Sequence, residues 1–500
     1  MPDFTIRSYD DFKAYCSQGT NQIQSKIIGI PGESYELFYL DQLINKDILH
    51  RDILHPLLEL GGGLGPDELL SYLPVGGGKK IDEWGEIPTL LLAGWIYVHP
   101  SFYESGVILQ ADQIPGRNLT AAENESQIFG PQVSFAESLD QNMALIRSIL
   151  NDPLLKTESF ITGDQTKTKT IMCYMEGLNN NAYVAMVRKR LSNLKTDGIL
   201  DCGMLSKLLE DNPDSIFPMY FLTERPDRTV GSLLEGKVIV LVGGSSRVMI
   251  APSTFIDFFK AEEDRYVHWQ MSAFVFILRM LAVFFSMLLT PLYVAALTFH
   301  YEMIPSALLD PLSSSRAKVP FPPLFEALLL EFIIELLREA GARLPTKVGQ
   351  TMGIVGGIVI GQAAVQAGFT SNLLIMIVAL GALASFTSPG FMMGTAIRIL
   401  RFPMIMIAGF WGGVGIVIGV SFLLIHLLRL TSLGTPYLKP FYPFDSSEFT
   451  ELFIRRPYGK FMDNLVKTFS FQARKEKGNT SETPDNGQKI DLFEQFQEEN

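Results

Sequence analysis

Apolar residues gather in the second half of the chain, in runs long enough for membrane-spanning helices. From residue 348 to 369 and from 370 to 393, no side chain carries a formal charge. Each run has the length of about 20 residues that a helix needs to cross the hydrocarbon of a bilayer. Similar runs occupy 271–299 and 403–428. The pattern predicts a membrane protein with a helical transmembrane domain over 269–430 that has about four spans.

Between the first and second predicted spans, the pattern becomes one-sided. Across 322–342, large apolar side chains recur at the i, i+3, i+4 and i+7 positions of a helix, and the charged side chains lie off this stripe. Pro322 and Pro323 suit a first helical turn, whereas Gly341 and Pro345 favour the end of a helix. These residues predict an amphipathic helix beside the spans.

The first 268 residues show short strand-like runs separated by helical patterns. Candidate strands include 25–30, 35–40, 169–175 and 238–242, and candidate helices include 135–150 and 181–194. This alternation predicts two soluble α/β subdomains, 1–150 and 151–268, each large enough to bury a core. After the last span we expect a cytoplasmic segment over 431–473 and, because 474–500 is polar and charged, a disordered tail.

Composition agrees with a soluble part joined to a membrane part, because 47% of the residues are hydrophobic and 19% are charged. The net charge of −12 argues against nucleic acid as a partner. The cysteines Cys16, Cys173 and Cys202 lie far apart, which favours free thiols over a metal site. The glycine-rich and histidine-containing stretches match no catalytic or cofactor-binding spacing. We therefore expect no enzyme activity, no cofactor and no metal.

The orientation follows from the expected crossings. No signal peptide is recognisable before the first subdomain, and four crossings would return the chain to its starting side. We therefore expect the N-terminal domain and the C-terminal tail to be cytoplasmic. Basic residues are expected on both sides of the bilayer, so the positive-inside rule favours one orientation of the spans only weakly. Arg279 lies inside the first span, and its charge should face protein or water rather than lipid.

The second predicted span carries the candidate pore residues. Glycines spaced by four permit close helix packing, and uncharged polar glutamines should face a partner or water. If several copies surround an axis, this helix is the candidate pore lining, with a β-branched residue as an apolar constriction. Most glycine stripes are only packing faces, and that alternative stays open. The packing candidates are Gly349, Gly353, Gly357 and Gly361; the pore or gate candidates are Gln350, Val355, Ile358, Val359, Gln362 and Gln366.

Glutamates on the amphipathic helix form a second candidate site, and two interpretations are open. They can be a solvated face that arginines of the same helix, Arg338 and Arg343, partly neutralise. Alternatively, they can form an acidic vestibule that concentrates cations in an oligomer, as acidic rings do in cation channels. The vestibule candidates are Glu326, Glu331, Glu335 and Glu339.

Several strings of residues resemble a known family. The amphipathic helix and the second span contain Pro320-Phe-Pro322, Glu335-Leu-Leu-Arg-Glu-Ala-Gly341, Arg343-Leu-Pro345 and Ile360-Gly-Gln-Ala-Ala-Val365. The soluble part and the segment after the last span add Thr223-Glu-Arg-Pro-Asp227, Leu233-Leu-Glu-Gly236 and Ser432-Leu-Gly-Thr-Pro-Tyr-Leu438. Over residues 35–445, the chain resembles the A subunit of the GerA-type spore germinant receptors. It departs from the family pattern at Gly130-Pro131-Gln-Val-Ser134 and at Gly243-Gly-Ser-Ser246.

The resemblance implies a subunit of a nutrient germinant receptor in the inner membrane of an endospore. It implies two partners, a nutrient-binding B-type subunit and a C-type lipoprotein subunit, and self-association into a homo-oligomer in the lipid bilayer. Such an oligomer would conduct cations when nutrient binds, with the N-terminal domain and the tail in the spore core. Two alternatives remain. One is a secondary transporter, which would use glycine- and proline-interrupted spans near an acidic helix. The other is a membrane-anchored scaffold subunit of the same complex.

Overall fold

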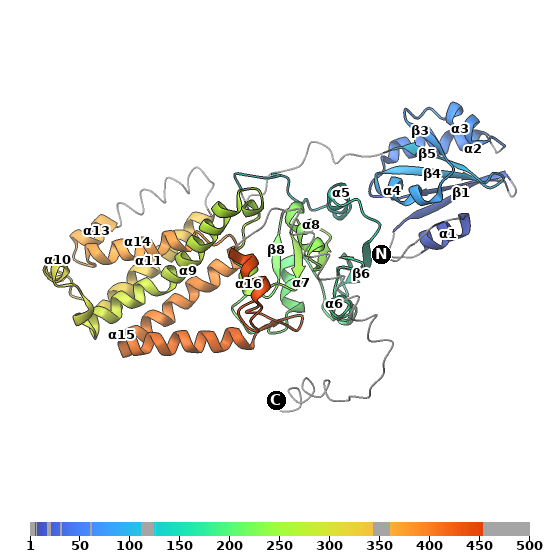
Figure 1. Cartoon of the computed structure of the whole chain (residues 1–500). Coiled ribbons are helices and arrows are strands. Elements are labelled where there is room, and N and C mark those ends of the chain that lie inside the picture. Colours follow the sequence, from blue (N-terminus) through green and yellow to red (C-terminus); the bar gives the residue numbers. More distant parts are fainter. Residues whose placement is uncertain are drawn as a thin grey trace, which may run out of the picture. The chain divides into compact units, whose positions relative to one another are not determined.

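The computed structural model describes residues 8–17, 22–30, 33–60, 63–111, 127–343 and 361–453, together with Ile6 and Glu125. Within these residues, two α/β subdomains precede a region made of helices (Figure 1). The predicted tail 474–500 and most of the predicted second span, 348–369, lie outside the described residues.

The first subdomain contains a five-stranded antiparallel sheet with helices on both faces. Its strands lie in the order β1-β2-β4-β5-β3. Neighbouring residues point to opposite faces, as a strand requires, so Leu37 and Phe38 belong to two different apolar clusters. The elements are α1 (Tyr9–Ser17), β1 (Gln24–Ile30), β2 (Glu33–Tyr39), η1 (Ile48–Leu54), α2 (His55–Leu60), α3 (Pro66–Tyr72), β3 (Gly78–Ile81), η2 (Trp84–Glu86), α4 (Ile87–Leu92), β4 (Trp95–Pro100) and β5 (Gly106–Gln110).

The second subdomain repeats this architecture with the strand order β6-β7-β9-β10-β8, again antiparallel. The central strand β9 has all five residues buried, because helices cover both faces of the sheet. The elements are α5 (Leu139–Ile149), β6 (Leu155–Thr162), β7 (Thr168–Met175), α6 (Asn181–Asn193), α7 (Cys202–Leu209), β8 (Phe221–Thr223), α8 (Pro226–Leu234), β9 (Val238–Val242), β10 (Val248–Ala251), η3 (Phe255–Phe259) and η4 (Glu262–Arg265).

Helix α5, just before the expected boundary at residue 150, packs mainly on the sheet of the second subdomain. Helix α5 was assigned to the first subdomain, but its Leu139, Met143 and Ile146 belong to the core of the second. The packing of this helix is decided by which sheet its apolar face covers.

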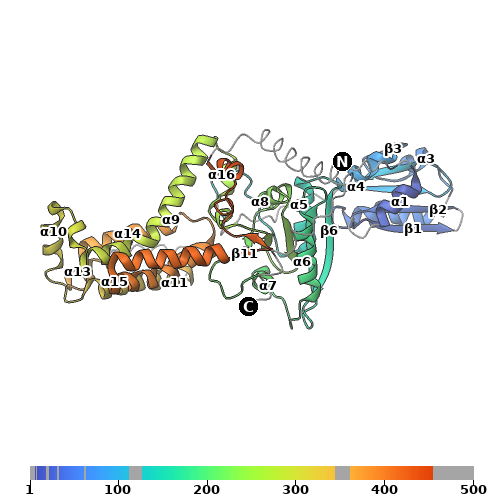
Figure 2. The same cartoon turned by 60° about the horizontal axis from the view of Figure 1, so that its bottom comes forward.

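The helical region follows directly, and Figures 1 and 2 show its long helices running alongside one another. Two of its helices, α9 and α15, are long and apolar enough to cross a membrane by length and composition. The elements are α9 (Trp269–Thr298), η5 (Tyr301–Met303), α10 (Ser306–Arg316), α11 (Pro323–Arg343), α13 (Gly361–Gln366), α14 (Asn372–Ser385), α15 (Phe391–Arg429), β11 (Thr431–Ser432), β12 (Thr435–Pro436) and α16 (Ser446–Phe453).

Helix α9 matches the span expected over 271–299, and α11 matches the amphipathic helix expected over 322–342. The run expected as one span over 370–393 is divided. Helix α14 ends at Ser385, and α15 begins at Phe391 after a short link that contains Pro389 and Gly390. The 14 residues of α14 extend about 21 Å, which is shorter than the hydrocarbon of a typical bilayer.

The span expected over 403–428 is also not one continuous helix. Gly412 has φ 59° and ψ −143°, which breaks α15 into two halves. A Cβ built on Gly415 would lie 2.6 Å from the Ile407 carbonyl oxygen, and one built on Gly419 would lie 2.6 Å from the Met404 sulfur. Residue numbers rise from 415 to 419 on the second half while their neighbours on the first half fall from 407 to 404. The two halves of α15 therefore form an antiparallel hairpin. The uniform hydropathy of this stretch concealed the break, because glycine is both apolar and able to adopt positive φ.

The chain enters and leaves the helical region at the end that contacts the second subdomain. On entry, Arg279 of α9 is buried, and its Nη1 donates to the Phe259 carbonyl at 2.7 Å and to Asp264 at 3.1 Å. This confirms that Arg279 faces protein. After α15, the Tyr437 hydroxyl donates to the Pro218 carbonyl at 2.6 Å, and the Phe255 amide donates to the Tyr437 carbonyl at 2.7 Å.

Candidate functional site

A buried ion pair lies at the centre of the helical region. Arg401 Nη1, on the first half of α15, donates to Glu331 Oε2 on α11 at 2.6 Å. Both side chains are 1% exposed. The Thr290 hydroxyl of α9 donates to the other carboxylate oxygen at 2.8 Å. A charge removed from water is tolerated only when it is paired and hydrogen-bonded, and this pair meets both conditions.

Arg401 also joins two further groups to the pair. Its Nη2 donates to Ser286 Oγ on α9 at 2.6 Å and to the Gly381 carbonyl of α14 at 3.3 Å. The network therefore connects α9, α11, α14 and α15 at one depth. Polar contacts of this kind hold helices together where every surrounding side chain is apolar. Charged groups buried in a membrane region commonly have a function as well as a structural role.

A second buried carboxylate, Glu326, lies about one and a half turns earlier on α11. The backbone amide of Ser371 donates to its Oε1 at 2.6 Å, and the Thr370 hydroxyl donates to the same oxygen at 3.1 Å. Its Oε2 lies 3.0 Å from Arg316 Nη1. Ser371 is the N-cap of α14, so the negative charge sits at the positive end of that helix dipole. The carboxylate thereby fixes where α14 begins.

The other two predicted glutamates are less buried and have local partners. Glu335 lies 3.6 Å from both Arg338 and Arg398, and its side chain is 27% exposed. Glu339 forms an exposed i,i+4 pair with Arg343. These two agree with the neutralised face that was one interpretation of the helix.

The structure places Glu326 and Glu331 inside the helical region rather than on an open vestibule. Helical periodicity showed that these glutamates lie off the apolar stripe of α11. It did not show that other helices cover that side as well and supply Arg316 and Arg401. An arginine at position 401, within an otherwise apolar stretch, was the signal in the sequence that could have suggested a buried partner.

The predicted pore segment is only partly described. Gln362 and Gln366 lie on the short helix α13 and are exposed, and no described atom lies within 4 Å of a Cβ built on Gly361. No hydrogen bond or ion pair among the described residues joins Gln362 or Gln366 to the glutamates of α11. The remaining candidates, Gly349, Gln350, Gly353, Val355, Gly357, Ile358 and Val359, lie outside the described residues.

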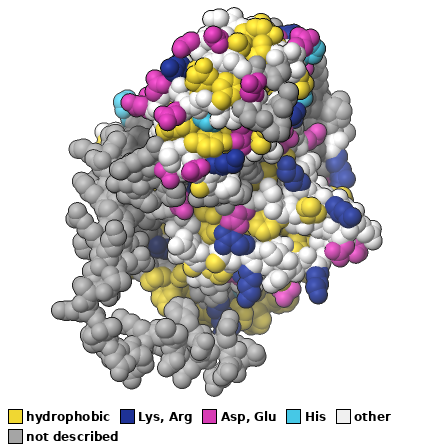
Figure 3. Space-filling model, turned by 90° about the vertical axis from the view of Figure 1, so that its right-hand side faces the viewer, with side chains coloured by type: hydrophobic (Ala, Val, Ile, Leu, Met, Phe, Trp, Pro, Cys, Tyr) yellow, Lys and Arg dark blue, Asp and Glu magenta, His cyan; other side chains and the backbone are white. Residues whose placement is uncertain are grey.

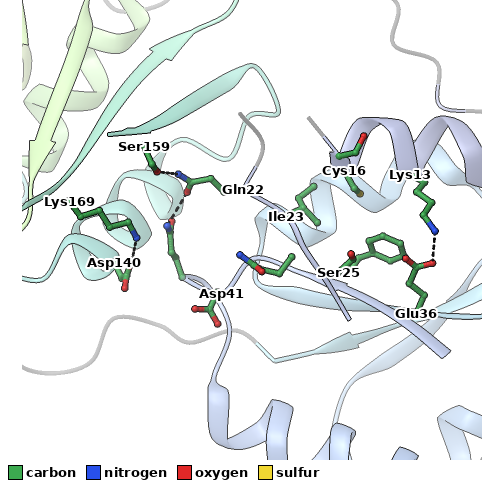
Figure 4. A pocket seen from close by; sticks show the side chains of 14 residues that line it. Lys13, Cys16, Gln22, Ile23, Ser25, Glu36, Asp41, Asp140, Ser159 and Lys169 are labelled. Carbon is green, nitrogen blue, oxygen red and sulfur yellow. Dashed lines mark hydrogen bonds and ion pairs between the residues drawn. The ribbon is translucent and has the colours of Figure 1, made fainter. Parts of the chain in front are cut away.

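The soluble part contains a cavity of about 550 Å³ with a mixed polar lining (Figure 4). Its charged groups already have partners: Lys13 lies 3.2 Å from Glu36, and Lys169 lies 3.9 Å from Asp140. Burial raises the pKa of the Cys16 thiol at this cavity to about 12, so the thiol stays protonated and is a poor nucleophile.

Surface charge and metal-binding geometry add no other site. On the face in Figure 3, acidic side chains are interspersed with basic ones. Among the described residues, no group of three or more His, Cys, Asp or Glu side chains is arranged to hold a metal ion. The buried network around Arg401 is therefore the strongest candidate in the part of the chain that the structure describes.

Comparison with known proteins identifies the family to which the chain is similar. The model of the Bacillus/Clostridium GerA spore germination protein family matches residues 10–464. The chain belongs to the GerA family. The match covers both soluble subdomains and the helical region, and it confirms the resemblance that the sequence motifs indicated.

Several GerA relatives are similar over most of the chain. Spore germination protein GerQA of Bacillus cereus is 43% identical over 458 residues, which is 91% of each protein. Spore germination protein GerIA of the same species is 43% identical over 441 residues, which is 88% of this chain and 65% of GerIA. The crystal structure of the N-terminal domain of the A subunit of the Bacillus megaterium spore germinant receptor GerK3 is 25% identical. It covers 49% of this chain and 92% of that domain, with a TM-score of 0.37.

Proposed function

We propose that this chain is the A subunit of a nutrient germinant receptor in the spore inner membrane. The observation that supports this proposal most directly is the family match over residues 10–464, because it includes the soluble subdomains together with the helical region. The subunit acts with a nutrient-binding B-type subunit and a C-type lipoprotein, and it self-associates. Its N-terminal domain and its tail lie on the spore-core side.

The oligomer provides a nutrient-gated path for cations, and the described residues favour a path between copies over a path through one copy. Within one copy, Glu326 and Glu331 are each neutralised by an arginine and enclosed by helices, so neither is free to attract a cation. Gln362 and Gln366, by contrast, are polar and exposed on an otherwise apolar region. Exposed amides at membrane depth are expected to face water or another subunit.

Gating then requires that nutrient binding stabilises an open arrangement of the subunits over a closed one. Val355, Ile358 or Val359 is the proposed apolar constriction, and Gln350 lies on the same predicted helix. The packing of Gly349, Gly353, Gly357 and Gly361 against a neighbouring helix would set the width of the path. In this mechanism Glu339, the most exposed of the four carboxylates, faces the cation entrance.

The proposal is tested by measuring ion conductance across membranes of cells that express this chain with its B-type and C-type partners. Val359→Ala is compared with wild type and with Val417→Ala, a matched change at an exposed valine of α15. A leak that widens for Val359→Ala and not for Val417→Ala supports the channel. Unchanged conductance in an intact complex points to the scaffold, and directional uptake coupled to a counter-ion points to the transporter. Spores without the chain should also lose the response to one nutrient and regain it on complementation.

A further inference from the structure

Three buried donor groups that make no short hydrogen bond lie at one end of the helical region. They are Arg338 Nη1 on α11, Arg398 Nε on α15 and Ser388 Oγ in the link between α14 and α15. Each of these atoms is shielded from solvent. Arg338 Nη1 and Arg398 Nε both lie 3.6 Å from the same oxygen, Glu335 Oε1, and Ser388 Oγ has no hydrogen-bond partner among the described residues. Buried donors are satisfied in nearly all folded proteins, whereas here two arginine donors share one oxygen at a long distance and a nearby hydroxyl has no acceptor. We call Arg338, Arg398 and Ser388 the donor cluster.

The two guanidinium groups of the donor cluster are held in place by their other nitrogens. Arg338 Nη2 donates to Ser385 Oγ at 3.0 Å, and Arg398 Nη2 donates to Thr395 Oγ1 at 2.9 Å. The Arg338 guanidinium also lies 4.6 Å above the ring of Phe386. Because both side chains are fixed, binding an additional acceptor would cost little side-chain entropy.

A glycine, Gly394, borders the donor cluster. A Cβ built on Gly394 would lie 3.8 Å from Arg398 Nη1, 3.8 Å from Ser388 Cβ and 4.0 Å from the Ser385 carbonyl oxygen. These are ordinary contact distances, so a larger side chain at position 394 would extend into the space that Arg398 and Ser388 border.

The charges at the donor cluster do not balance. Glu335 is the carboxylate within 4.0 Å of Arg338 and Arg398, and it lies 3.6 Å from each, beyond a good hydrogen bond. The nearby Arg401 already pairs with Glu331. Two guanidinium groups therefore share one carboxylate, which leaves one excess positive charge in a half-buried place. An anion with several oxygen acceptors would supply both the charge and the missing hydrogen bonds.

The donor cluster also lies at a suitable depth for a lipid headgroup. It belongs to the end of the helical region that contacts the second subdomain, since a Cβ on Gly390 would lie 3.3 Å from the Phe258 carbonyl oxygen. Phe386 and Phe391 flank the link there and are 68% and 75% exposed. Exposed aromatic residues beside basic residues at the end of apolar helices are typical of the membrane interface.

We propose that the donor cluster binds the phosphate group of an anionic lipid. Both guanidinium groups and the Ser388 hydroxyl donate to phosphate oxygens, and Glu335 limits the affinity because it competes for the same arginines. Basic pockets between membrane helices bind anionic headgroups in this way. Inorganic phosphate offers the same chemistry, and the experiment distinguishes the two. The proposal does not depend on ion conduction by the receptor.

The test titrates the purified, delipidated full chain in neutral detergent and measures binding by native mass spectrometry. The probes are short-chain phosphatidylglycerol, short-chain phosphatidylcholine and inorganic phosphate. We expect phosphatidylglycerol to bind at least about fivefold more tightly than phosphatidylcholine. Equal binding of the two lipids overturns the proposal. Saturation by inorganic phosphate that phosphatidylglycerol cannot displace overturns the lipid as the source of the anion.

Two variants that should change phosphatidylglycerol affinity in opposite directions distinguish an anion-binding site from a structural role. Arg398→Gln should weaken phosphatidylglycerol binding by about fivefold to tenfold, because it removes one of two arginines. Glu335→Gln should tighten binding, because it removes the competing carboxylate. Arg343→Gln is the matched control: it removes an exposed arginine at the end of the same helix and should leave binding unchanged.

A merely structural role predicts that Arg398→Gln and Glu335→Gln both lower the melting temperature and leave the preference for phosphatidylglycerol unchanged, and that result refutes the proposal. If Arg398→Gln does not fold, Arg398→Lys keeps the charge but loses the planar fork and should bind with intermediate affinity. Glu335→Gln binding more weakly than wild type also refutes the proposal.

Discussion

Replacing Arg401 by methionine should expose how much the helical region depends on its central ion pair. Methionine is a similar length but cannot donate to Glu331, Ser286 or the Gly381 carbonyl. After the change, the Glu331 carboxylate remains buried, with Thr290 as its hydrogen-bond donor. The variant therefore does not only lose an attraction; it leaves an uncompensated charge away from water.

The expected cost follows from this geometry. Removing one partner of a buried, hydrogen-bonded ion pair lowers the free energy of unfolding by about 3–5 kcal/mol. Both side chains here are 1% exposed, and Arg401 makes three hydrogen bonds, so a value in that range is expected. Removing both charges in Arg401→Met combined with Glu331→Leu should return the stability to within about 1 kcal/mol of wild type, because no isolated charge is left.

The assay is unfolding in mixed micelles with increasing SDS, followed by tryptophan fluorescence. The matched control is Arg343→Met, which breaks the exposed pair with Glu339 and should change the free energy of unfolding by about 0.5 kcal/mol or less. The reasoning is refuted if Arg401→Met is as mild as Arg343→Met, or if the double variant is as unstable as Arg401→Met alone.

Two further predictions concern a backbone position and a titrating side chain. Gly412→Ala should destabilise the hairpin of α15 by about 1–3 kcal/mol, because its Cβ would lie 2.9 Å from Phe299 Cβ and 3.0 Å from His300 Nε2 at positive φ. In the same unfolding assay Gly341→Ala, whose Cβ would have no described atom within 4 Å, should be neutral or stabilising. Burial raises the pKa of Glu210 from 4.5 to about 7, so its contribution to stability is present below pH 4.5 and is lost as the pH rises towards 7. Glu210→Gln should flatten this part of the curve of stability against pH, and an unchanged slope would contradict the assignment.

The sequence predicted the helices and strands whose apolar pattern is regular along a single segment. Helix α9 was expected because an apolar run of that length has few other solutions, and α11 was expected from its helical period and its prolines. Strand β9 was expected among the short strand-like runs, and the structure buries it on both faces of the sheet. Such features depend on local composition and period, which a single sequence contains.

The divided helices were missed for a definite reason. The turns at Pro389–Gly390 and at Gly412 lie inside stretches of uniform hydropathy, and glycine contributes to an apolar run without forcing a helix. Gly412 adopts its unusual conformation because the second half of α15 packs against the first half. The lack of a Cβ at Gly415 and Gly419 permits this pairing, because a Cβ there would lie 2.6 Å from the Ile407 carbonyl oxygen and the Met404 sulfur, respectively.

The sequence by itself determined the family, the separation into a soluble and an apolar part, and the presence of glutamates on α11. Tertiary structure alone decided that Glu326 and Glu331 are buried with Arg316 and Arg401 as partners. The physical reason is that hydrophobic period reports which side of a helix avoids water, and this can be read from one segment. The partner of a buried charge instead comes from another helix, up to 70 residues away in the chain, and only packing brings the two together.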